Sequence, residues 1–253
     1  MKYDNGESYD ESTKGPYYHL WFQIMEHYLE IYLPETGRVL DAGGGTGEFS
    51  LRTAALRQAI SIVNLDASSA MLDRARWKVK EQELADRIRC MPGDVHSMPF
   101  EDGAFDYVMC FGDVLSFCKE PKRAFAELGR VTAKKGQLHL SVNSFWGNFH
   151  FMMGQGGDQF SFKDARDYYR TKVLHTNGES TGCRSFTLSE LKGYAGDCNL
   201  SIRKIFAAPV FPAANDWLKD DRIAEEIKEL QYRHCEDENL LELGNHINVI
   251  YEK

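Results

Sequence analysis

A cluster of glycines with an acid on either side follows the first strongly apolar segment of the chain. Residues 39–48 read Val-Leu-Asp-Ala-Gly-Gly-Gly-Thr-Gly-Glu, which places Asp41 two residues before Gly43 and Gly45 two residues after it. Glycines at this spacing let the backbone turn tightly and approach a ligand closely. The last glycine of a dinucleotide fingerprint would fall on Glu48, whose carboxylate would repel a pyrophosphate at the following helix. The loop therefore favours a nucleoside whose attached group is not a phosphate, with Asp41 suited to an ammonium or an ordered water.

Two further acids stand at the ends of the next two apolar segments. Asp66 follows Asp41 by 66 − 41 = 25 residues, and Asp94 comes just after the third segment. An ionised carboxylate only accepts hydrogen bonds, so Asp66 could bind both hydroxyls of a ribose. Asp94 could accept a hydrogen bond from an exocyclic amine while the backbone amide of Val95 donates to a ring nitrogen. Because the carboxyl ends of parallel strands meet at one edge, we expect the three acids to face one crevice.

Along the chain, segments with strand-like spacing of apolar residues alternate with segments of helix-like spacing. Period-2 and continuous apolar runs predict strands, and helical spacing predicts helices between them. The predicted strands are 38–42, 60–65, 88–91, 105–111, 137–143, 200–207 and 246–251, and the predicted helices are 16–33, 49–58, 68–84, 120–131, 187–198 and 214–233. This alternation predicts a single α/β domain over residues 1–253, with a doubly wound, mostly parallel sheet.

Two segments fall outside this alternation. Residues 1–15 are polar and predict a mobile leader to the first helix, which ends by residue 33. Residues 144–186 lack sustained periodicity and are too long for an ordinary connection, so they predict a lid inserted after the fifth strand. Residues 1–22 and 144–186 hold 15 aromatic residues in 22 + 43 = 65, about 23%, against 12% for the whole chain. We expect these segments to close over the crevice as a hydrophobic cage, or else to form a small satellite core.

Composition restricts the class of partner. The 253 residues carry 30 basic and 38 acidic side chains, a net charge of −8, which disfavours a nucleic-acid-binding face. No apolar run is long enough to cross a membrane, and the polar N-terminal segment lacks the apolar core of a signal peptide. Six cysteines in no paired spacing indicate reduced thiols rather than disulfides or a metal site. We therefore expect a cytoplasmic protein without metal that acts on a small molecule.

Four stretches of the chain resemble the successive motifs of class I S-adenosylmethionine-dependent methyltransferases. They read VLDAGGGTGEFS, NLDASSAMLDRAR, GDVHSMPFEDGAFDYVMCFGDVL and AFAELGRVTAKKGQLHLSV. The similarity runs from about residue 37 to 143 and returns weakly in the closing GNHINVIYEK. The resemblance implies a Rossmann-like sheet of seven strands with an antiparallel last strand. It also implies methyl transfer from S-adenosylmethionine to a small or medium organic acceptor, leaving S-adenosylhomocysteine.

The same resemblance implies a role for individual residues. The matches to the glycine loop hold the methionine part of the cofactor, the second acid binds the ribose, and the third acid with its neighbour binds the adenine. The end of the fourth strand, Cys110 or Phe111, offers a backbone carbonyl to the cofactor's amino group, and aromatic faces of the leader attract the sulfonium. The predicted cofactor-binding residues are Asp41, Gly43, Gly45, Asp66, Ala67, Asp94, Val95, Cys110 and Tyr18.

No histidine stands out as a catalytic base. His139 lies within a strand pattern and is expected to be an interior residue, and His96 would sit beside adenine. His150 and His175 fall in the predicted lid, and His234 in a charged turn. The catalytic residues and the methylated atom (O, N, S or C) are therefore left open. A cofactor-binding protein without catalysis is an alternative, as is a nicotinamide-dependent oxidoreductase, which the acid at the end of the glycine loop disfavours.

Overall fold

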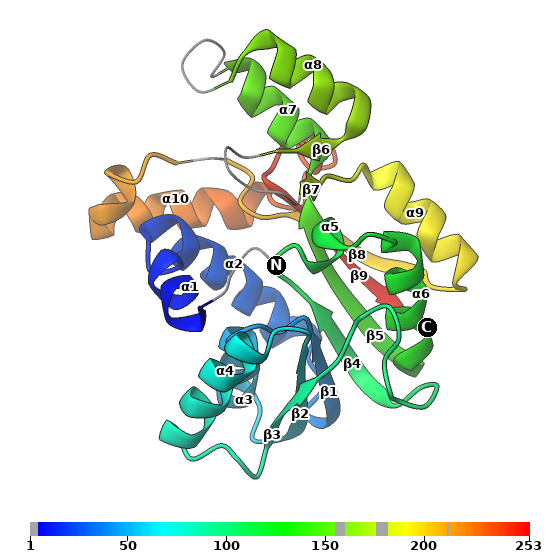
Figure 1. Cartoon of the computed structure of the whole chain (residues 1–253). Coiled ribbons are helices and arrows are strands. Elements are labelled where there is room, and N and C mark those ends of the chain that lie inside the picture. Colours follow the sequence, from blue (N-terminus) through cyan, green and yellow to red (C-terminus); the bar gives the residue numbers. More distant parts are fainter. Residues whose placement is uncertain (1–4, 155–159, 176–181, 212) are drawn as a thin grey trace.

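The chain folds around a seven-stranded sheet of order β3-β2-β1-β4-β5-β9-β8 (Figure 1). The computed structural model describes residues 5–154, 160–175, 182–211 and 213–253. The strands are β1 (Thr36–Ala42), β2 (Ala59–Asp66), β3 (Ile88–Pro92), β4 (Phe105–Cys110), β5 (Thr132–Asn143), β8 (Ser201–Ala207) and β9 (His246–Glu252). Strands β1 to β5 pair in parallel, and β9 runs antiparallel to both of its neighbours. The predicted class I methyltransferase fold, including its antiparallel last strand, is confirmed.

Helices cover both faces of this sheet, as Figure 1 shows. They are α2 (Pro16–Tyr32), α3 (Glu48–Leu56), α4 (Ser69–Glu81), α6 (Pro121–Val131), α9 (Leu188–Asp197) and α10 (Asp221–His234). Successive strand residues point to opposite faces, so Val39 and Tyr107 join one core with α2 and α3, while Leu40 and Val108 join the other with α6 and α9. Apolar burial on both faces, at roughly 25 cal/mol per Å², is the main stabilising contribution to a sheet of this kind.

The order of the strands reverses between β1 and β4. β1 pairs with β2 on one side and β4 on the other, with Asp41 opposite both Asn64 and Met109. Chain segments leaving these strands therefore diverge to opposite faces and leave a crevice at the carboxyl ends. In doubly wound sheets this is the place where ligands bind.

The N-terminal segment is more ordered than the sequence predicts. Residues 1–4 lie outside the described part, but α1 (Gly6–Ser12) is a helix where a mobile leader was expected. The Asn5 side chain accepts the Glu7 amide at its start. A seven-residue helix is too short to be stable alone, and α1 is held by contacts with α4, which local periodicity does not reveal.

The predicted lid also contains regular structure. Its described part forms α7 (Phe145–Gly154), α8 (Phe162–Thr171) and the short strands β6 (Val173–Leu174) and β7 (Cys183–Arg184); residues 155–159 and 176–181 lie outside it. Figure 1 shows α7 and α8 side by side beyond the end of the sheet. They enclose a small core of Phe145, Met152, Ala165 and Tyr168. The sequence analysis expected no packed elements here, and that expectation is wrong. Helix α7 is apolar nearly all round, so its sequence has no amphipathic period that would have indicated a helix.

Several boundaries differ from the predicted ones. β5 begins at Thr132 rather than residue 137, and α10 begins at Asp221 after a 3-10 turn, Trp217–Lys219, rather than at residue 214. The Asp220 side chain caps α10 by accepting two backbone amides, a start signal that the periodicity alone did not locate. Among the helices of the described residues, none has the length and apolar character needed to cross a membrane.

Candidate functional site

The glycine loop after β1 contains two glycines that serve different purposes. Gly43 and Gly45 both have left-handed backbones, with φ of 74° and 53°. A Cβ at Gly43 would lie 2.3 Å from Cγ2 of Val114, whereas a Cβ at Gly45 would meet no atom within 4 Å. Gly43 is therefore required by packing within the protein, contrary to the expectation that its space belongs to the ligand. The open space at Gly45 fits a bound group.

Asp41 lies behind this loop and is buried. It accepts a hydrogen bond from the Ser50 hydroxyl at 2.7 Å. Burial raises the pKa of Asp41 to about 6. The hydrogen bonds from Ser50 oppose this rise, and the charge of Asp66 adds to it. An acid that is costly to ionise in the free protein gains from a nearby cation. The predicted ammonium partner fits that environment.

Asp66 ends β2, and backbone amides from two directions hold its carboxylate. The Gly45 amide donates to Oδ2 at 2.9 Å and the Ser68 amide donates to Oδ1 at 2.8 Å. Burial raises the pKa of Asp66, while these amides oppose the rise. Each carboxylate oxygen has a second lone pair, so the group can still accept two ribose hydroxyls. Ala67, which follows it, is exposed.

Asp94 and its neighbours lie at the end of β3. The Asp94 carboxylate is 64% exposed and Oδ1 accepts the His96 amide at 2.9 Å. The same oxygen lies 2.6 Å from Nδ1 of His96. The hydrogen bond from the His96 amide lowers the pKa of Asp94. Val95 is buried in the core, so its side chain supports the turn.

The end of β4 completes this edge of the sheet. Cys110 is fully buried, and burial raises the pKa of its thiol well above the usual range. Only its backbone can therefore serve a ligand, as the resemblance implies. The ring of Phe111 packs 4.8 Å from that of Phe49, and both line the hollow beside the glycine loop.

That hollow is small because α1 covers it. It measures about 60 Å³ and is lined by the glycine loop, Trp21, Phe22 and Tyr9, whereas ligand pockets usually measure about 300–1,000 Å³. The hollow therefore covers only the glycine-loop part of the site, because Asp66 and Asp94 are not among its lining residues. Tyr18 is not among the residues that line the hollow in the described part of the chain, and its role stays a prediction.

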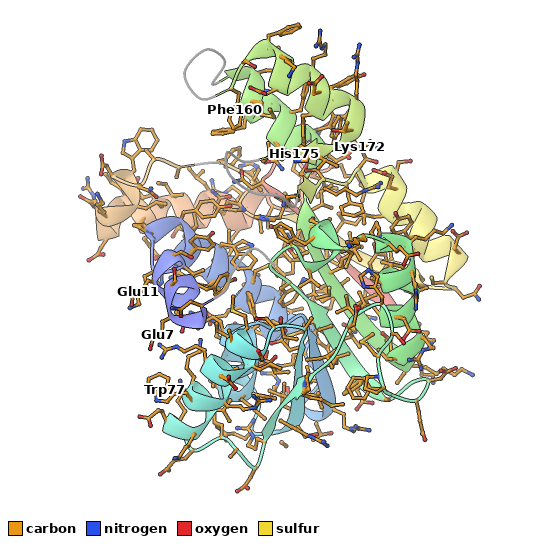
Figure 2. All side chains as sticks on the ribbon, in the orientation of Figure 1. Glu7, Glu11, Trp77, Phe160, Lys172 and His175 are labelled. Carbon is orange, nitrogen blue, oxygen red and sulfur yellow. The ribbon has the colours of Figure 1, made fainter. Side chains whose placement is uncertain are left out.

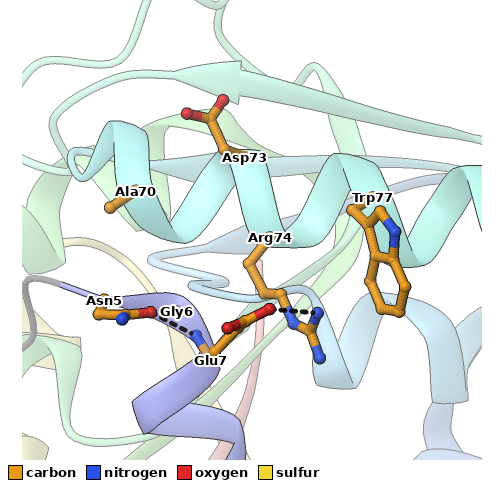
Figure 3. A pocket seen from close by; sticks show the side chains of 7 residues that line it. All are labelled: Asn5, Gly6, Glu7, Ala70, Asp73, Arg74 and Trp77. Carbon is orange, nitrogen blue, oxygen red and sulfur yellow. Dashed lines mark hydrogen bonds and ion pairs between the residues drawn. The ribbon is translucent and has the colours of Figure 1, made fainter.

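A charged network holds α1 in place. Asp10 accepts the Thr46 hydroxyl at 2.7 Å and pairs with Arg74 at 2.7 Å and Lys78 at 3.1 Å. Figure 3 shows the outer side of this contact, where Glu7 pairs with Arg74 at 3.5 Å. A shallow hollow of about 560 Å³ lies there between α1 and α4. The network ties the glycine loop directly to the N-terminal helix.

Beyond β4 the structure brings together an acid and a histidine that the sequence analysis did not single out. Oδ2 of Asp113 lies 3.1 Å from Nε2 of His246, and Nδ1 of His246 lies 3.1 Å from the Ala208 carbonyl oxygen. His246 stands opposite Asn143 in the β5–β9 ladder, at the same end of the sheet as the glycine loop. Asp113 has a φ of 65°, which is uncommon for a residue with a side chain. Local sequence gives no signal for this pair, which depends on the pairing of β9.

His139, His150 and His175 lie where the sequence analysis placed them, whereas His234 ends helix α10 instead of standing in a turn. His139 is fully buried 3.0 Å from the Tyr107 hydroxyl, and burial lowers its pKa to about 3. His150 and His175 are exposed. Figure 2 shows His175 at the base of the α7–α8 pair. The same view shows Glu7, Glu11 and Trp77 at the outer edge of α1 and α4. Within the described ranges no three His, Cys, Asp or Glu side chains gather as metal ligands would.

Comparison with known proteins identifies a methyltransferase domain in the central part of the chain. A family model described as a methyltransferase domain matches residues 39–136. The chain is 33% identical to a ubiquinone/menaquinone biosynthesis C-methyltransferase of Citrifermentans bemidjiense over 156 residues, which cover 57% of this chain and 66% of that protein. It is 40% identical to a malonyl-[acyl-carrier protein] O-methyltransferase of Erwinia pyrifoliae over 122 residues, 47% of this chain and 43% of that one. The matches thus span about half to two thirds of these relatives.

The solved structures agree on the fold. An S-adenosylmethionine-dependent methyltransferase from Methanosarcina mazei superimposes with a TM-score of 0.64 at 18% identity, covering 89% of this chain and 96% of that one. Matched motifs, strand order and the acids at the ends of β1, β2 and β3 agree with the predicted resemblance and the cofactor it implies. Over residues 39–136 the chain carries a methyltransferase domain with the motifs and strand order of class I S-adenosylmethionine-dependent methyltransferases.

Proposed function

We propose that this protein transfers the methyl group of S-adenosylmethionine to a small organic acceptor. The observation that carries the proposal is the carboxylate of Asp66, held by the Gly45 and Ser68 amides beside open space, with buried Asp41 behind it. Such a site offers acceptors for a ribose and a counter-charge for an ammonium. The names of two relatives support an acceptor outside the nucleic acids. One is a ubiquinone/menaquinone biosynthesis C-methyltransferase, and the other is a malonyl-[acyl-carrier protein] O-methyltransferase.

The residues at the strand ends divide the cofactor between them. Asp41 would bind the ammonium with the backbone of Gly43 and Gly45 along the methionine, and Asp66 with Ala67 would bind the ribose. The adenine would lie between Asp94, the Val95 amide and the turn after β3. The carbonyl of Cys110 or Phe111 and the ring of Tyr18 are the remaining proposed contacts.

The bound cofactor supplies a methyl group on a sulfonium, which is already activated for transfer to a nucleophile. The protein's own contribution is to align the acceptor and exclude water, effects that can lower a barrier by several kcal/mol. Trp21, Phe22 and Phe111 surround the loop with aromatic faces, and such faces attract a cation.

Thermal unfolding with two ligands tests the cofactor assignment. S-adenosylhomocysteine at 100 times its dissociation constant should stabilise the protein by about 2.7 kcal/mol, and NAD should leave the melting temperature unchanged. Stabilisation by NAD alone would contradict the proposal and favour a nicotinamide-dependent enzyme. The structure weakens the charge argument against such an enzyme, because Glu48 is paired with Arg52 and Lys78.

One observation favours the alternative of a binding protein without catalysis, namely the docking of α1 beside the glycine loop, where Tyr9 lines the small hollow and Asp10 accepts the Thr46 hydroxyl. Under that alternative the protein would bind S-adenosylmethionine tightly and hold it unreacted. The acidic net charge of −8 supports our further proposal of no nucleic-acid partner. The six free cysteines support our proposal of a cytoplasmic location.

A further inference from the structure

A second hollow lies on the far side of the Asp113–His246 pair. It measures about 480 Å³ and is formed by α7, residues 210–211 and the turn at 240–245. Its lining is mostly apolar, with Phe151, Val210, Phe211, Leu240 and Leu243. Its polar lining residues are Asn148, His150 and Asn245. Its volume lies in the range of sites for small organic ligands.

The Asp113–His246 pair lies between this hollow and the glycine loop. On one side, Asn245 lines the large hollow and donates to the Tyr17 hydroxyl at 3.0 Å. On the other side, Trp21 lines the small hollow and its ring centroid lies 5.9 Å from that of His246. Gly112, which precedes Asp113, lines the small hollow as well. Residues that line the two hollows thus flank the pair, although neither Asp113 nor His246 itself lines either hollow.

The hydrogen bonds of the pair define its charge. Nδ1 of His246 faces a carbonyl oxygen and Nε2 faces a carboxylate oxygen, and both of these partners only accept. Hydrogens on both ring nitrogens satisfy both contacts, and the raised pKa of His246 favours this imidazolium form beside Asp113. The second carboxylate oxygen, Oδ1 of Asp113, is buried and has no hydrogen-bond partner among the described residues. A buried acceptor without a donor is costly, as is the left-handed backbone of Asp113.

We infer that the large hollow binds the apolar body of the methyl acceptor and that Oδ1 of Asp113 receives its O–H or N–H. This inference rests on the proposed methyl transfer and deepens it. Asp113 is then a catalytic residue, because it touches the acceptor, and His246 is a positioning residue, because it holds Oδ2 and acts through Asp113. The acceptor class is an apolar, drug-sized molecule with one proton-bearing nucleophile.

The proposed step conserves atoms and charge. The acceptor's oxygen or nitrogen forms a bond to the methyl carbon with its own electron pair, while the methyl–sulfur bond breaks and its pair stays on sulfur. The proton of the acceptor passes to Oδ1 of Asp113. Proton transfer of this kind contributes about 10²–10⁴-fold to a rate.

Two matched probes separate the acid from the hollow. 1-Naphthol carries an O–H on an apolar body, and 1-methoxynaphthalene is the same body without the hydrogen. Their affinities would be measured by calorimetry on the full chain saturated with S-adenosylhomocysteine. We expect 1-naphthol to bind roughly tenfold more tightly, the size of one hydrogen bond to a charged group.

Three variants then test the named residues. Asp113→Asn should bring the ratio of the two affinities close to one, and Asp102→Asn, on a surface turn, should leave it at the wild-type value. His246→Gln keeps a donor toward Asp113 without the charge and should lower the ratio of the two affinities only in part. A mere loss of packing would not change this ratio. Leu243→Arg should abolish the binding of both probes.

The affinity for S-adenosylhomocysteine is measured in every variant and reports on the proposed function separately. If it binds normally and the wild type has equal affinity for both probes, or binds neither, the inference is wrong while the methyltransferase assignment stands. Unchanged probe binding by Leu243→Arg would likewise exclude this hollow as the acceptor site. If S-adenosylhomocysteine does not bind, the proposed function itself fails.

Discussion

The two halves of the site are built in different ways. The cofactor half consists of the turns after β1, β2, β3 and β4, each a few residues long and each following its own strand. The acceptor half joins α7, residues 210–211, the turn at 240–245 and the Asp113–His246 pair. Motifs describe the first half, whereas the second exists only where distant segments meet.

Sequence separation measures this difference. The Gly45 amide and the Asp66 carboxylate are 21 residues apart, within one βαβ unit. Asp113 and His246 are 133 residues apart, and Tyr17 and Asn245 are 228 apart. A site assembled over such separations depends on the whole sheet, so its residues carry no local pattern of their own.

The sharpest test within the cofactor half replaces the two left-handed glycines. Gly43→Val should lower the free energy of unfolding by about 3–5 kcal/mol, because the new side chain would overlap Val114 and sit on an unfavourable backbone. Urea unfolding measures the loss.

Gly45→Ala is the matched control for that substitution. It should cost only about 1–2 kcal/mol of backbone strain, since nothing lies within 4 Å of the new methyl group, yet it should weaken S-adenosylhomocysteine binding. Equal destabilisation by both variants would erase the distinction between a packing glycine and a ligand glycine.

Asp41→Asn should reveal the cost of the buried acid. The pKa of Asp41 is raised to about 6 in the folded protein from about 3.9 when unfolded, so the native state holds more protons and wild-type stability falls as pH rises between these values. The variant lacks this fall. Relative to wild type it should gain up to about 3 kcal/mol between pH 4 and pH 7.

Urea unfolding at both pH values measures that gain. The same variant should bind S-adenosylhomocysteine less tightly at pH 7, because the counter-charge for the ammonium is lost. A pH-independent difference in stability would indicate that Asp41 is not the group that titrates.

Asp66→Ala should weaken S-adenosylhomocysteine binding by roughly 10–100-fold, the loss of charge-assisted hydrogen bonds worth about 1.5–3 kcal/mol. Calorimetry measures the affinity. Asp102→Ala is the control, because Asp102 is an exposed acid paired with Arg130 on a surface turn, and its affinity should match the wild type. Full affinity in Asp66→Ala would remove the ribose contact from the cofactor half.

The smallest effect is expected in the acceptor half. Burial would lower the pKa of His246, but Asp113 and the Ala208 carbonyl raise it above its usual range. A raised imidazole pKa stabilises the fold fully below about pH 6.5 and loses that contribution as pH rises through the folded value. The titratable groups facing His246 are Asp113 and, beyond Asn245, Tyr17.

Comparing wild type with His246→Gln isolates that contribution. Between pH 6 and pH 9 the wild type should lose more stability than the variant, because its imidazole loses a proton that the folded state binds more tightly than the unfolded state. Parallel stability curves for the two proteins would argue against an imidazolium at this position.

Local rules were sufficient wherever a residue's role depends on its own strand and turn. The alternation of strands and helices, the capping box of Thr187 and Glu190 that starts α9, and the buried, neutral His139 follow from short segments. A capping box also starts α8, where Ser161 and Asp164 exchange hydrogen bonds. Attention to that signal would have predicted the helix that the sequence analysis missed in residues 144–186.

The sequence by itself determined the sheet, the cofactor class and the acids at the ends of its strands, because these lie in consecutive βαβ units whose geometry repeats from protein to protein. Only the tertiary structure decided which surfaces meet across the crevice. The docking of α1 through Asp10, the packing role of Gly43 against Val114 and the Asp113–His246 pair all depend on side chains brought together from distant segments. Such contacts follow from the complete packing of the sheet and its helices, which no window of the sequence contains.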